Sequence, residues 1–292
     1  MTKIISITGD LGSGKSTISD PLCKRLNYEY IYTGKIQREI AHKYNMTTLE
    51  LNKYSETHPE IDEEIDSTFK SLGQSTDLVV DSRLAWFFVP NSFKVFLKTN
   101  IIVSANRITG DGLRVNEKYS SREDAVNKIT ARKASENKRY MELYGANCSD
   151  LTNFNLIIDT SFITPERVVD IMIAEYNSWL TSGKCSKAFI SPTNLYPTKS
   201  VSDFESDDFK GILNNMKTNG YNQESSVTAV SINGFDYIVD GHKRTSSAIK
   251  NGVDLIPVVF QNGNIPNSAE RNLFSKWEEI NSFKYLTYPN IS

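Results

Sequence analysis

ISITGDLGSGKSTIS, residues 5–19, combines an apolar strand, a glycine-rich turn and the start of a helical pattern. Its spacing fits G-x-x-x-x-G-K-[ST], a loop whose backbone N–H groups converge on the phosphates of a nucleotide. The glycines allow positive φ angles and a close approach of the backbone, and the helix N-terminus favours an anion. We therefore predict nucleotide binding by Gly9, Asp10, Gly12, Ser13, Gly14, Lys15, Ser16 and Thr17.

Two side chains of this loop predict how the nucleotide is held. We expect Lys15 to reach the β- and γ-phosphates of ATP and the Ser16 hydroxyl to hold Mg²⁺. Asp81 ends a predicted strand beside the loop and is a second candidate for orienting Mg²⁺ or its waters. ATP and Mg²⁺ are thus the predicted cofactors, but the loop does not identify the acceptor.

The composition is that of an ordinary globular protein of about two domains. The chain has 292 residues, of which 39% are hydrophobic and 23% charged, with a formal net charge of −2. This balance gives no general electrostatic attraction to nucleic acid. Cys23, Cys148 and Cys185 lack the spacing of a disulfide framework or a zinc site. Since no apolar run reaches the length of a membrane span and no signal-peptide pattern is present, we expect a cytoplasmic protein without membrane contact.

Short apolar runs alternate with helical patterns in the first part of the chain, which is typical of an α/β fold. Strands are predicted at residues 4–7, 28–32, 78–81, 93–97 and 156–159. They make a sheet of about five parallel strands, with flanking helices predicted at 18–26, 35–44 and 47–69. Residues 101–144 form a basic helical region, which is either a solvated surface or a source of phosphate contacts. Its cationic residues are Arg107, Arg114, Lys118, Arg122, Lys128, Arg132, Lys133, Lys138 and Arg139.

Several blocks, in the expected order, make residues 1 to about 180 resemble the cytidylate kinase family, especially its short archaeal-type branch. The blocks are GDLGSGKST, TGKIQREIA, HPEIDEEID, VVDSRLA, ARKASENKRYMELYG and LIIDTSFITPERVV. The resemblance implies a P-loop kinase fold. It also implies an enzyme that moves the γ-phosphoryl group of ATP to a pyrimidine nucleotide.

The resemblance implies that two blocks bind the acceptor. Thr33, Gly34 and Arg38 lie in the TGKIQREIA block, and Arg83 lies in the VVDSRLA block. Arg38 and Arg83 match arginines that grip the monophosphate in the family. Guanidinium groups suit this role because they bind phosphate oxygens bidentately.

The catalytic residues implied by the resemblance lie around the transferred phosphoryl group. Arg132 and Arg139 are seven residues apart, so they share nearly one face of a helix, and they match arginines that close over this group. Lys15 and Asp81 complete the predicted catalytic set, because phosphoryl transfer depends mainly on positioning and charge stabilisation.

Helical periodicity stops within residues 179–188, which include Gly183. We therefore predict a P-loop kinase domain at 1–182, expected to fold as a complete layered unit, and a smaller α+β domain at 187–292. In the second domain, residues 227–232 and 235–239 predict a hairpin with an Asn-Gly turn.

The segment after this hairpin resembles the ParB/sulfiredoxin superfamily, in which a G-x-x-R sequence begins a helix. The resemblance covers residues 187 to about 262 and implies a phosphate or nucleotide contact by Asp240, Gly241, His242 and Arg244. It also makes DNA a candidate partner. Residues beyond Gln261 carry no motif that assigns them a role.

Three functions remain open at this point. The first is transfer of the γ-phosphoryl group of ATP to a free pyrimidine nucleotide. The second is transfer to a hydroxyl of a modified pyrimidine base in DNA, of the 5-hydroxymethyluracil type, with Asp81 as the base and the ParB-like domain holding the DNA. The third is a non-catalytic, nucleotide-dependent DNA-binding switch. The sequence does not indicate an oligomeric state.

Overall fold

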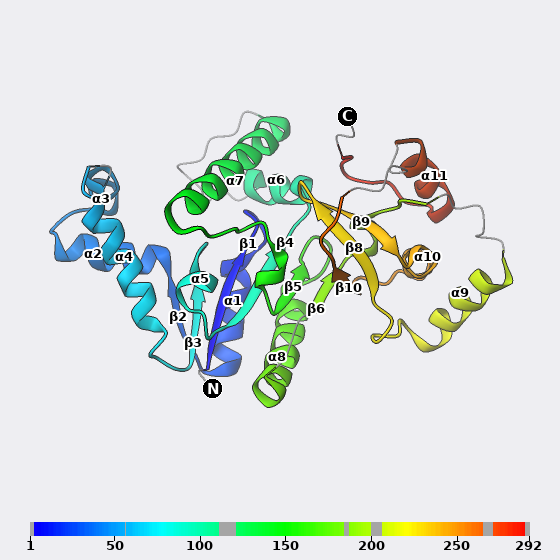
Figure 1. Cartoon of the computed structure of the whole chain (residues 1–292), viewed down its shortest axis with the longest axis horizontal. Coiled ribbons are helices and arrows are strands. Elements are labelled where there is room, and N and C mark those ends of the chain that lie inside the picture. The colour runs from blue at the N-terminus through cyan, green and yellow to red at the C-terminus, as the bar shows by residue number, and fades with distance from the viewer. Residues whose placement is uncertain are drawn as a thin grey trace. The chain divides into compact units, whose positions relative to one another are not determined.

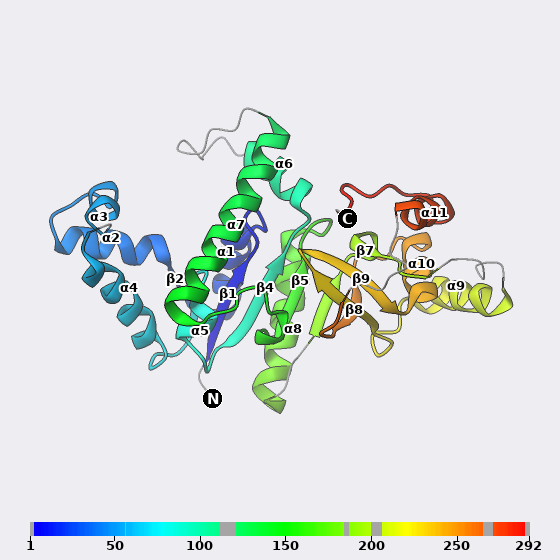
Figure 2. The same cartoon turned by 45° about the horizontal axis from the view of Figure 1, so that its top comes forward.

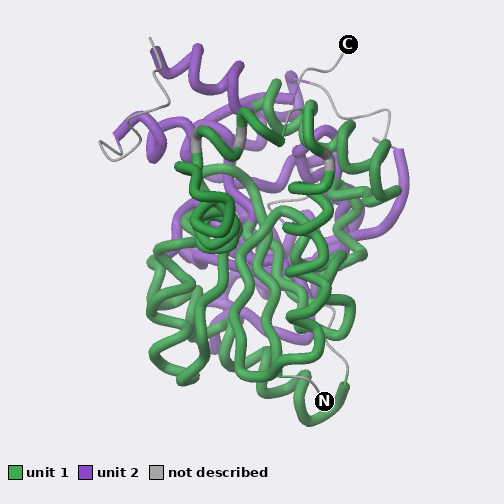
Figure 3. Tube along the Cα trace, turned by 90° about the vertical axis from the view of Figure 1, so that its left-hand side faces the viewer, with its two compact units in different colours: residues 1–97, 130–156, 164–186 green, residues 98–129, 157–163, 187–292 purple. Residues whose placement is uncertain are grey.

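The computed structural model describes residues 3–55, 57–110, 121–183, 187–199, 206–264 and 271–289. The chain forms two compact units, shown in Figure 3: residues 1–97, 130–156 and 164–186, and residues 98–129, 157–163 and 187–292. Arg114, Lys118 and Cys185 lie outside the described residues. No helix of the described part is both long and apolar enough to cross a membrane.

A parallel sheet forms the centre of the first unit. Its strands are β1 (Ile4–Gly9), β2 (Glu29–Tyr32), β3 (Leu78–Asp81), β4 (Phe93–Lys98) and the start of β5 (Leu156–Asp159), in the order β2-β3-β1-β4-β5. β1 is buried throughout and pairs in parallel with β3 and with β4. The backbone N–H of Asn155 donates to the Lys94 carbonyl (2.9 Å) and that of Thr160 to the Lys98 carbonyl (2.9 Å), so β5 runs parallel to β4. The predicted parallel α/β sheet is confirmed.

Helices flank this sheet. They are α1 (Lys15–Leu26), α2 (Thr33–Lys43), α3 (Thr48–Ser55), α4 (Pro59–Leu72), α5 (Ala85–Phe88), the part of α7 (Arg122–Tyr144) from residue 130 onward, and α8 (Pro165–Ser182). Figures 1 and 2 show α2, α3 and α4 gathered at the β2 edge of the sheet. The single helix predicted at 47–69 is two helices, because Pro59 cannot continue a preceding helix and His58 adopts a non-helical conformation with φ −130° and ψ 81°.

A mixed sheet forms the centre of the second unit. Its strands are β6 (Lys187–Ile190), β7 (Leu195–Tyr196), β8 (Val227–Ile232), β9 (Phe235–Asp240) and β10 (Ile256–Phe260), in the order β6-β10-β8-β9-β7. Asn233 and Gly234 join β8 to β9 with φ values of 53° and 86°, which confirms the predicted hairpin turn. The described helices of this unit are α6 (Ile101–Gly110), the part of α7 up to Ile129, α9 (Asp207–Asn219), α10 (His242–Lys250) and α11 (Arg271–Asn281).

The stretch beyond Gln261, for which the sequence assigned no role, contributes to the core of the second unit. Phe274 and Trp277 of α11 are fully buried. Tyr285 stacks on Tyr196 of β7 with ring centroids 4.4 Å apart. These apolar contacts make the end of the described chain part of the second unit's core.

The compact units divide the chain differently from the predicted boundary near residue 183, because residues 98–129 and 157–163 cluster with residues 187–292. Asp159 is 1% exposed, and its carboxylate accepts hydrogen bonds from the backbone N–H of Ser191 (3.2 Å) and from Nδ2 of Asn194 (2.7 Å). Lys98 forms an ion pair of 3.1 Å with the buried carboxylate of Asp236. Polar groups from the first half of the chain are therefore satisfied by groups from the second half.

Truncation after Gly183 tests this dependence. The fragment lacks Asn194, so the buried carboxylate of Asp159 loses a donor. It also lacks Asp236, so Lys98 loses this ion pair. Since losing contacts to buried charged groups is destabilising, we expect the fragment to melt at a lower temperature than the full chain, or to aggregate. Circular dichroism of both proteins during heating checks this, and equal cooperative melting would instead support an autonomous first domain.

Candidate active site

The turn between β1 and α1 has the backbone conformation that a phosphate cradle requires. Gly9, Gly12 and Gly14 have φ values of 152°, 76° and 83°, which L side chains rarely adopt. A Cβ atom at Gly9 would lie 2.2 Å from the carbonyl oxygen of Leu97. Because glycine has no side chain, the end of β1 can pack directly against the backbone of β4 where the loop begins.

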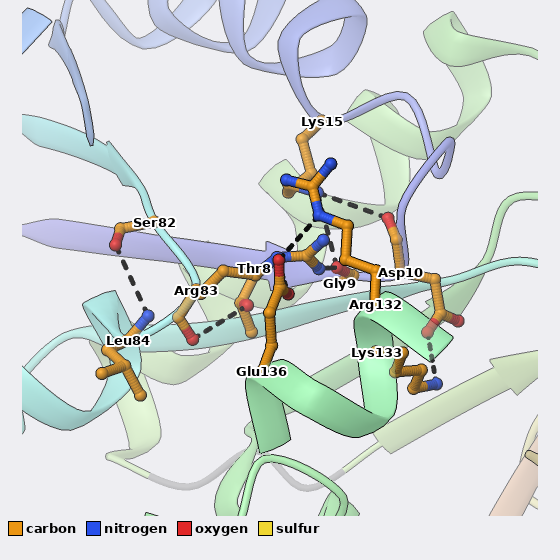
Figure 4. A network of polar contacts seen from close by, with 10 residues as sticks. All are labelled: Thr8, Gly9, Asp10, Lys15, Ser82, Arg83, Leu84, Arg132, Lys133 and Glu136. Carbon is orange, nitrogen blue, oxygen red and sulfur yellow. Dashed lines mark hydrogen bonds and ion pairs between the residues drawn. The ribbon is translucent and has the colours of Figure 1, made fainter. Parts of the chain in front are cut away.

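The side chain of Lys15 folds back over the loop that precedes it in the chain. Its Nζ donates to the backbone carbonyls of Gly9 (3.4 Å) and Asp10 (3.3 Å), as Figure 4 shows. Burial, with the nearby charge of Arg83, lowers the pKa of Lys15 to about 8. A cation held by carbonyl dipoles at the start of a helix is suited to meet a phosphate charge.

Ser16 and Asp81, the predicted Mg²⁺ ligands, share a neighbour that the sequence did not reveal. The Tyr30 hydroxyl donates to Oδ2 of Asp81 at 3.0 Å and also hydrogen-bonds with Ser16. Burial raises the pKa of Asp81, while the charge of Lys15 opposes this rise. The hydroxyl and the carboxylate therefore lie on one side of the cradle, and two hard oxygen donors there fit Mg²⁺.

Arg83 and Arg132 meet at the cradle through a carboxylate that no sequence motif indicated. Glu136 of α7 forms an ion pair with Nε of Arg83 (3.1 Å) through one oxygen and accepts from Nε of Arg132 (2.8 Å) through the other. Arg83 also donates from an Nη to the Gly9 carbonyl, so its guanidinium group touches the cradle itself (Figure 4). The i, i+4 spacing of Arg132 and Glu136 places them on one face of α7.

Lys133 is a further cation at the cradle that the sequence placed only within a basic run. Its Nζ forms an ion pair of 2.6 Å with the Asp10 carboxylate (Figure 4). The backbone N–H of Asp10 donates to the Leu97 carbonyl at 2.9 Å. The basic stretch of α7 thus supplies contacts to the cradle and is not only a solvated surface.

The other arginines predicted at the site have aromatic neighbours. Arg38 of α2 donates to the Tyr32 hydroxyl and lies 5.3 Å from the centroid of that ring. Arg139 of α7 lies over the ring of Tyr140 at 5.2 Å. Thr33 and Gly34 form the first turn of α2, directly after β2. The structure brings Lys15, Arg83 and Arg132 into one polar network, whereas the described contacts of Arg38 and Arg139 are with tyrosines.

In the second unit, the Asp240–Arg244 turn opens α10 as predicted, with Gly241 at a φ of 99°. Burial, together with the charge of Lys199, lowers the pKa of His242 to about 4, and its Nε2 accepts from the backbone N–H of Thr198 at 3.0 Å. The imidazole is therefore neutral, and its hydrogen bond with Thr198 lies inside the second unit. Arg244 pairs with Asp240 at 2.8 Å, and a phosphate contact at this turn stays a prediction.

The model of the cytidylate kinase-like family matches residues 4–162, which contain the cradle and the arginines around it. The chain belongs to this family. Its curated relatives include the cytidylate kinase of Pyrococcus abyssi, which is 36% identical over 59% of this chain and 92% of that protein. The cytidylate kinase of Thermococcus kodakarensis is 35% identical over 62% of this chain and 91% of that protein. Among solved structures, the shikimate kinase from Bacteroides thetaiotaomicron aligns with 61% of this chain and 98% of its own, at 15% identity and a TM-score of 0.42.

Membership in this family identifies the protein as an ATP-dependent kinase, with ATP as the phosphoryl donor and Mg²⁺ as its metal cofactor. A purely non-catalytic switch is therefore not supported. The family model ends at residue 162 and does not extend to residues 187–292. Neither a ParB/sulfiredoxin-like second domain nor a DNA base as acceptor is supported by these comparisons.

The lowered pKa of Lys15 predicts that ATP binding takes up protons. Without nucleotide, a growing share of Lys15 is neutral as the pH rises through about 8. Bound phosphate favours the charged ammonium form and raises its pKa, so binding near pH 8 draws a proton from solution, and affinity falls at higher pH. Isothermal titration calorimetry in two buffers of different ionisation enthalpy measures this uptake.

The matched control for this titration is Lys15→Met, which removes the titrating group at similar side-chain length. It is expected to bind ATP more weakly and without proton uptake. Absence of net uptake by the unaltered protein at pH 8 would remove Lys15 from the phosphate site.

Proposed function

We propose that this kinase transfers the γ-phosphoryl group of ATP to a free pyrimidine nucleoside monophosphate, with cytidylate as the first candidate. The observation that carries this proposal is the position of Arg83, whose guanidinium group contacts the cradle at the Gly9 carbonyl. An arginine beside the cradle is suited to bring an acceptor phosphate next to the γ-phosphoryl group. The names of the relatives, cytidylate kinases, support the choice of base.

The proposed division of labour follows from where the cations lie. Lys15 and Arg132 act on the phosphoryl group during transfer, because both belong to the network around the cradle. Arg38 and Arg83 bind the acceptor phosphate, with Thr33 and Gly34 at the start of α2 lining the same side. Ser16 and Asp81 hold Mg²⁺, which neutralises charge on the phosphates when it is bound.

A monophosphate acceptor simplifies the chemistry that the protein must supply. The attacking oxygen of a phosphate is already ionised near neutral pH, so no general base is needed. Asp81 is then available as a metal ligand, in agreement with its contact with Tyr30 beside Ser16. A hydroxyl acceptor would require Asp81 to take a proton instead.

For the second unit, we propose that the turn before α10 contacts a phosphate group of a nucleotide or of DNA, as a ParB/sulfiredoxin-like domain would. The supporting observation is the presence of Arg244 and Lys199 near the start of this helix. Arg244→Ala is the test. It should weaken the binding of a fluorescent nucleotide or oligonucleotide and reduce the salt dependence of that binding. Equal binding by both proteins would refute this role.

Transfer of label from the γ-phosphate of ATP identifies the acceptor of the kinase reaction. The full-length protein is offered CMP, dCMP, UMP, AMP and GMP in parallel with DNA that contains 5-hydroxymethyluracil. Label on CMP or another pyrimidine monophosphate is the expected result. Label on the DNA alone would overturn the proposal and favour a hydroxyl acceptor.

Arg38→Ala is expected to raise the KM for the acceptor monophosphate and to leave the KM for ATP unchanged, because Arg38 lies on α2 and its described partner is Tyr32. Losing a charge-assisted phosphate contact costs about 1.5–3 kcal/mol, which is roughly tenfold or more in acceptor kcat/KM. Steady-state kinetics with each substrate varied in turn measures both constants.

Arg25→Ala is the matched control, since Arg25 is a half-exposed arginine paired with Asp170 at 2.7 Å. It should change neither KM. An equal rise of both KM values in Arg38→Ala would show that Arg38 does not belong to a separate acceptor site.

A further inference from the structure

Glu136 is a carboxylate at the centre of a site that must bind phosphate. Its side chain is 18% exposed, and its two oxygens contact Nε of Arg83 (3.1 Å) and Nε of Arg132 (2.8 Å). Figure 4 shows it lying between these arginines beside the cradle. A negative charge among phosphate-binding cations needs an explanation, because it opposes the binding of a further anion.

The atoms used in these contacts indicate what the carboxylate does. Glu136 contacts each of the two guanidinium groups at Nε, the nitrogen nearest the side-chain stem. An arginine side chain has many rotamers, and holding it at Nε fixes the plane of the guanidinium group. One Nη of Arg83 already reaches the cradle at the Gly9 carbonyl. The Nε contacts therefore orient these groups at the cradle.

We infer that Glu136 is a positioning residue that holds Arg132 in the orientation needed for the transferred phosphoryl group and Arg83 in the orientation needed for the acceptor phosphate beside it. This inference rests on the proposed phosphoryl transfer and adds a residue to it. Glu136 keeps its Nε contacts while phosphate binds, so both arginines are oriented before the reaction begins. Electrostatic stabilisation of transfer is greatest when its donors are oriented in advance.

If Glu136 instead competed with phosphate for the arginines, its substitution would have the opposite effect on binding. If Glu136 merely occupied the place of a phosphate, removing its charge would strengthen phosphate binding. If Glu136 positions the arginines, either removing its charge or shortening its side chain weakens binding of the transferred group. Glu136→Gln removes the charge at constant size, and Glu136→Asp keeps the charge but shortens the side chain.

The experiment compares ADP binding with binding of ADP plus aluminium fluoride, an anionic mimic of the transferred phosphoryl group, in the full-length protein with Mg²⁺. Both Glu136→Gln and Glu136→Asp are expected to weaken the fluoroaluminate complex by about tenfold or more and to leave ADP binding within about twofold. With the acceptor identified by labelling, kcat should fall by roughly 100-fold with little change in the KM for ATP. Thermal melting confirms that the variants are folded.

Glu142→Gln is the matched control, because Glu142 lies on the same helix, is 64% exposed and pairs only loosely with Lys138 at 3.8 Å. It should behave as the unaltered protein. Unchanged or tighter fluoroaluminate binding by Glu136→Gln, or normal behaviour of Glu136→Asp, would overturn the inference. If the unaltered protein itself bound ADP no differently with and without aluminium fluoride, the proposed phosphoryl transfer would fail instead, so the two failures are distinguishable.

Discussion

The positive charges gathered at the turn after β1 are the constraint on which the rest of the first unit depends. Lys15, Arg83 and Lys133 come from three separate segments and reach the same loop, and Arg132 joins them through the Glu136 carboxylate that it shares with Arg83. Cations this close repel one another unless carboxylates or a ligand offset their charges. Without phosphate, the carboxylates of Asp10 and Glu136 take part of that role, and burial lowers the pKa of Lys15. A bound nucleotide would supply the larger share of negative charge.

The backbone around the loop makes this concentration of charge possible. Gly9 passes so close to Leu97 that no side chain fits there, and Asp81 ends β3 beside β1. The carboxyl ends of three neighbouring strands thus meet at one edge of the sheet, where α/β proteins place their ligand sites. The cation on α1, the carboxylate on β3 and the arginines from the β3–α5 turn and α7 all project from elements fixed by this sheet.

The sequence predicted those parts of the structure that depend on local patterns. Short apolar runs identified the parallel strands, and the spacing of Gly9, Gly14 and Lys15 identified the cradle, because both signals lie within a few residues. The hairpin at Asn233-Gly234 was predicted for the same reason. Pro59 was a local signal for a break between two helices, but the long acidic helical pattern around it led to the prediction of a single helix.

What the sequence did not predict depends on segments that meet only in the folded chain. Tyr30 reaches Asp81 from another strand, and Glu136 reaches Arg83 from a helix far along the chain. The compact units also differ from the division expected near residue 183, because Asp159 takes two of its partners from Ser191 and Asn194 in the second half of the chain. Such pairings follow from topology, which residue spacing alone does not encode.

We propose that the cradle and its arginines form one continuous site for two phosphate-bearing substrates. The most direct measurement is the affinity of a bisubstrate analogue, adenosine and cytidine joined through their 5′ positions by five phosphates, compared with that of ATP. One continuous site predicts binding on the order of 100-fold tighter than ATP, because the analogue engages the ATP and acceptor contacts together. An affinity equal to that of ATP would overturn this proposal, since it would mean that no acceptor phosphate site adjoins the cradle.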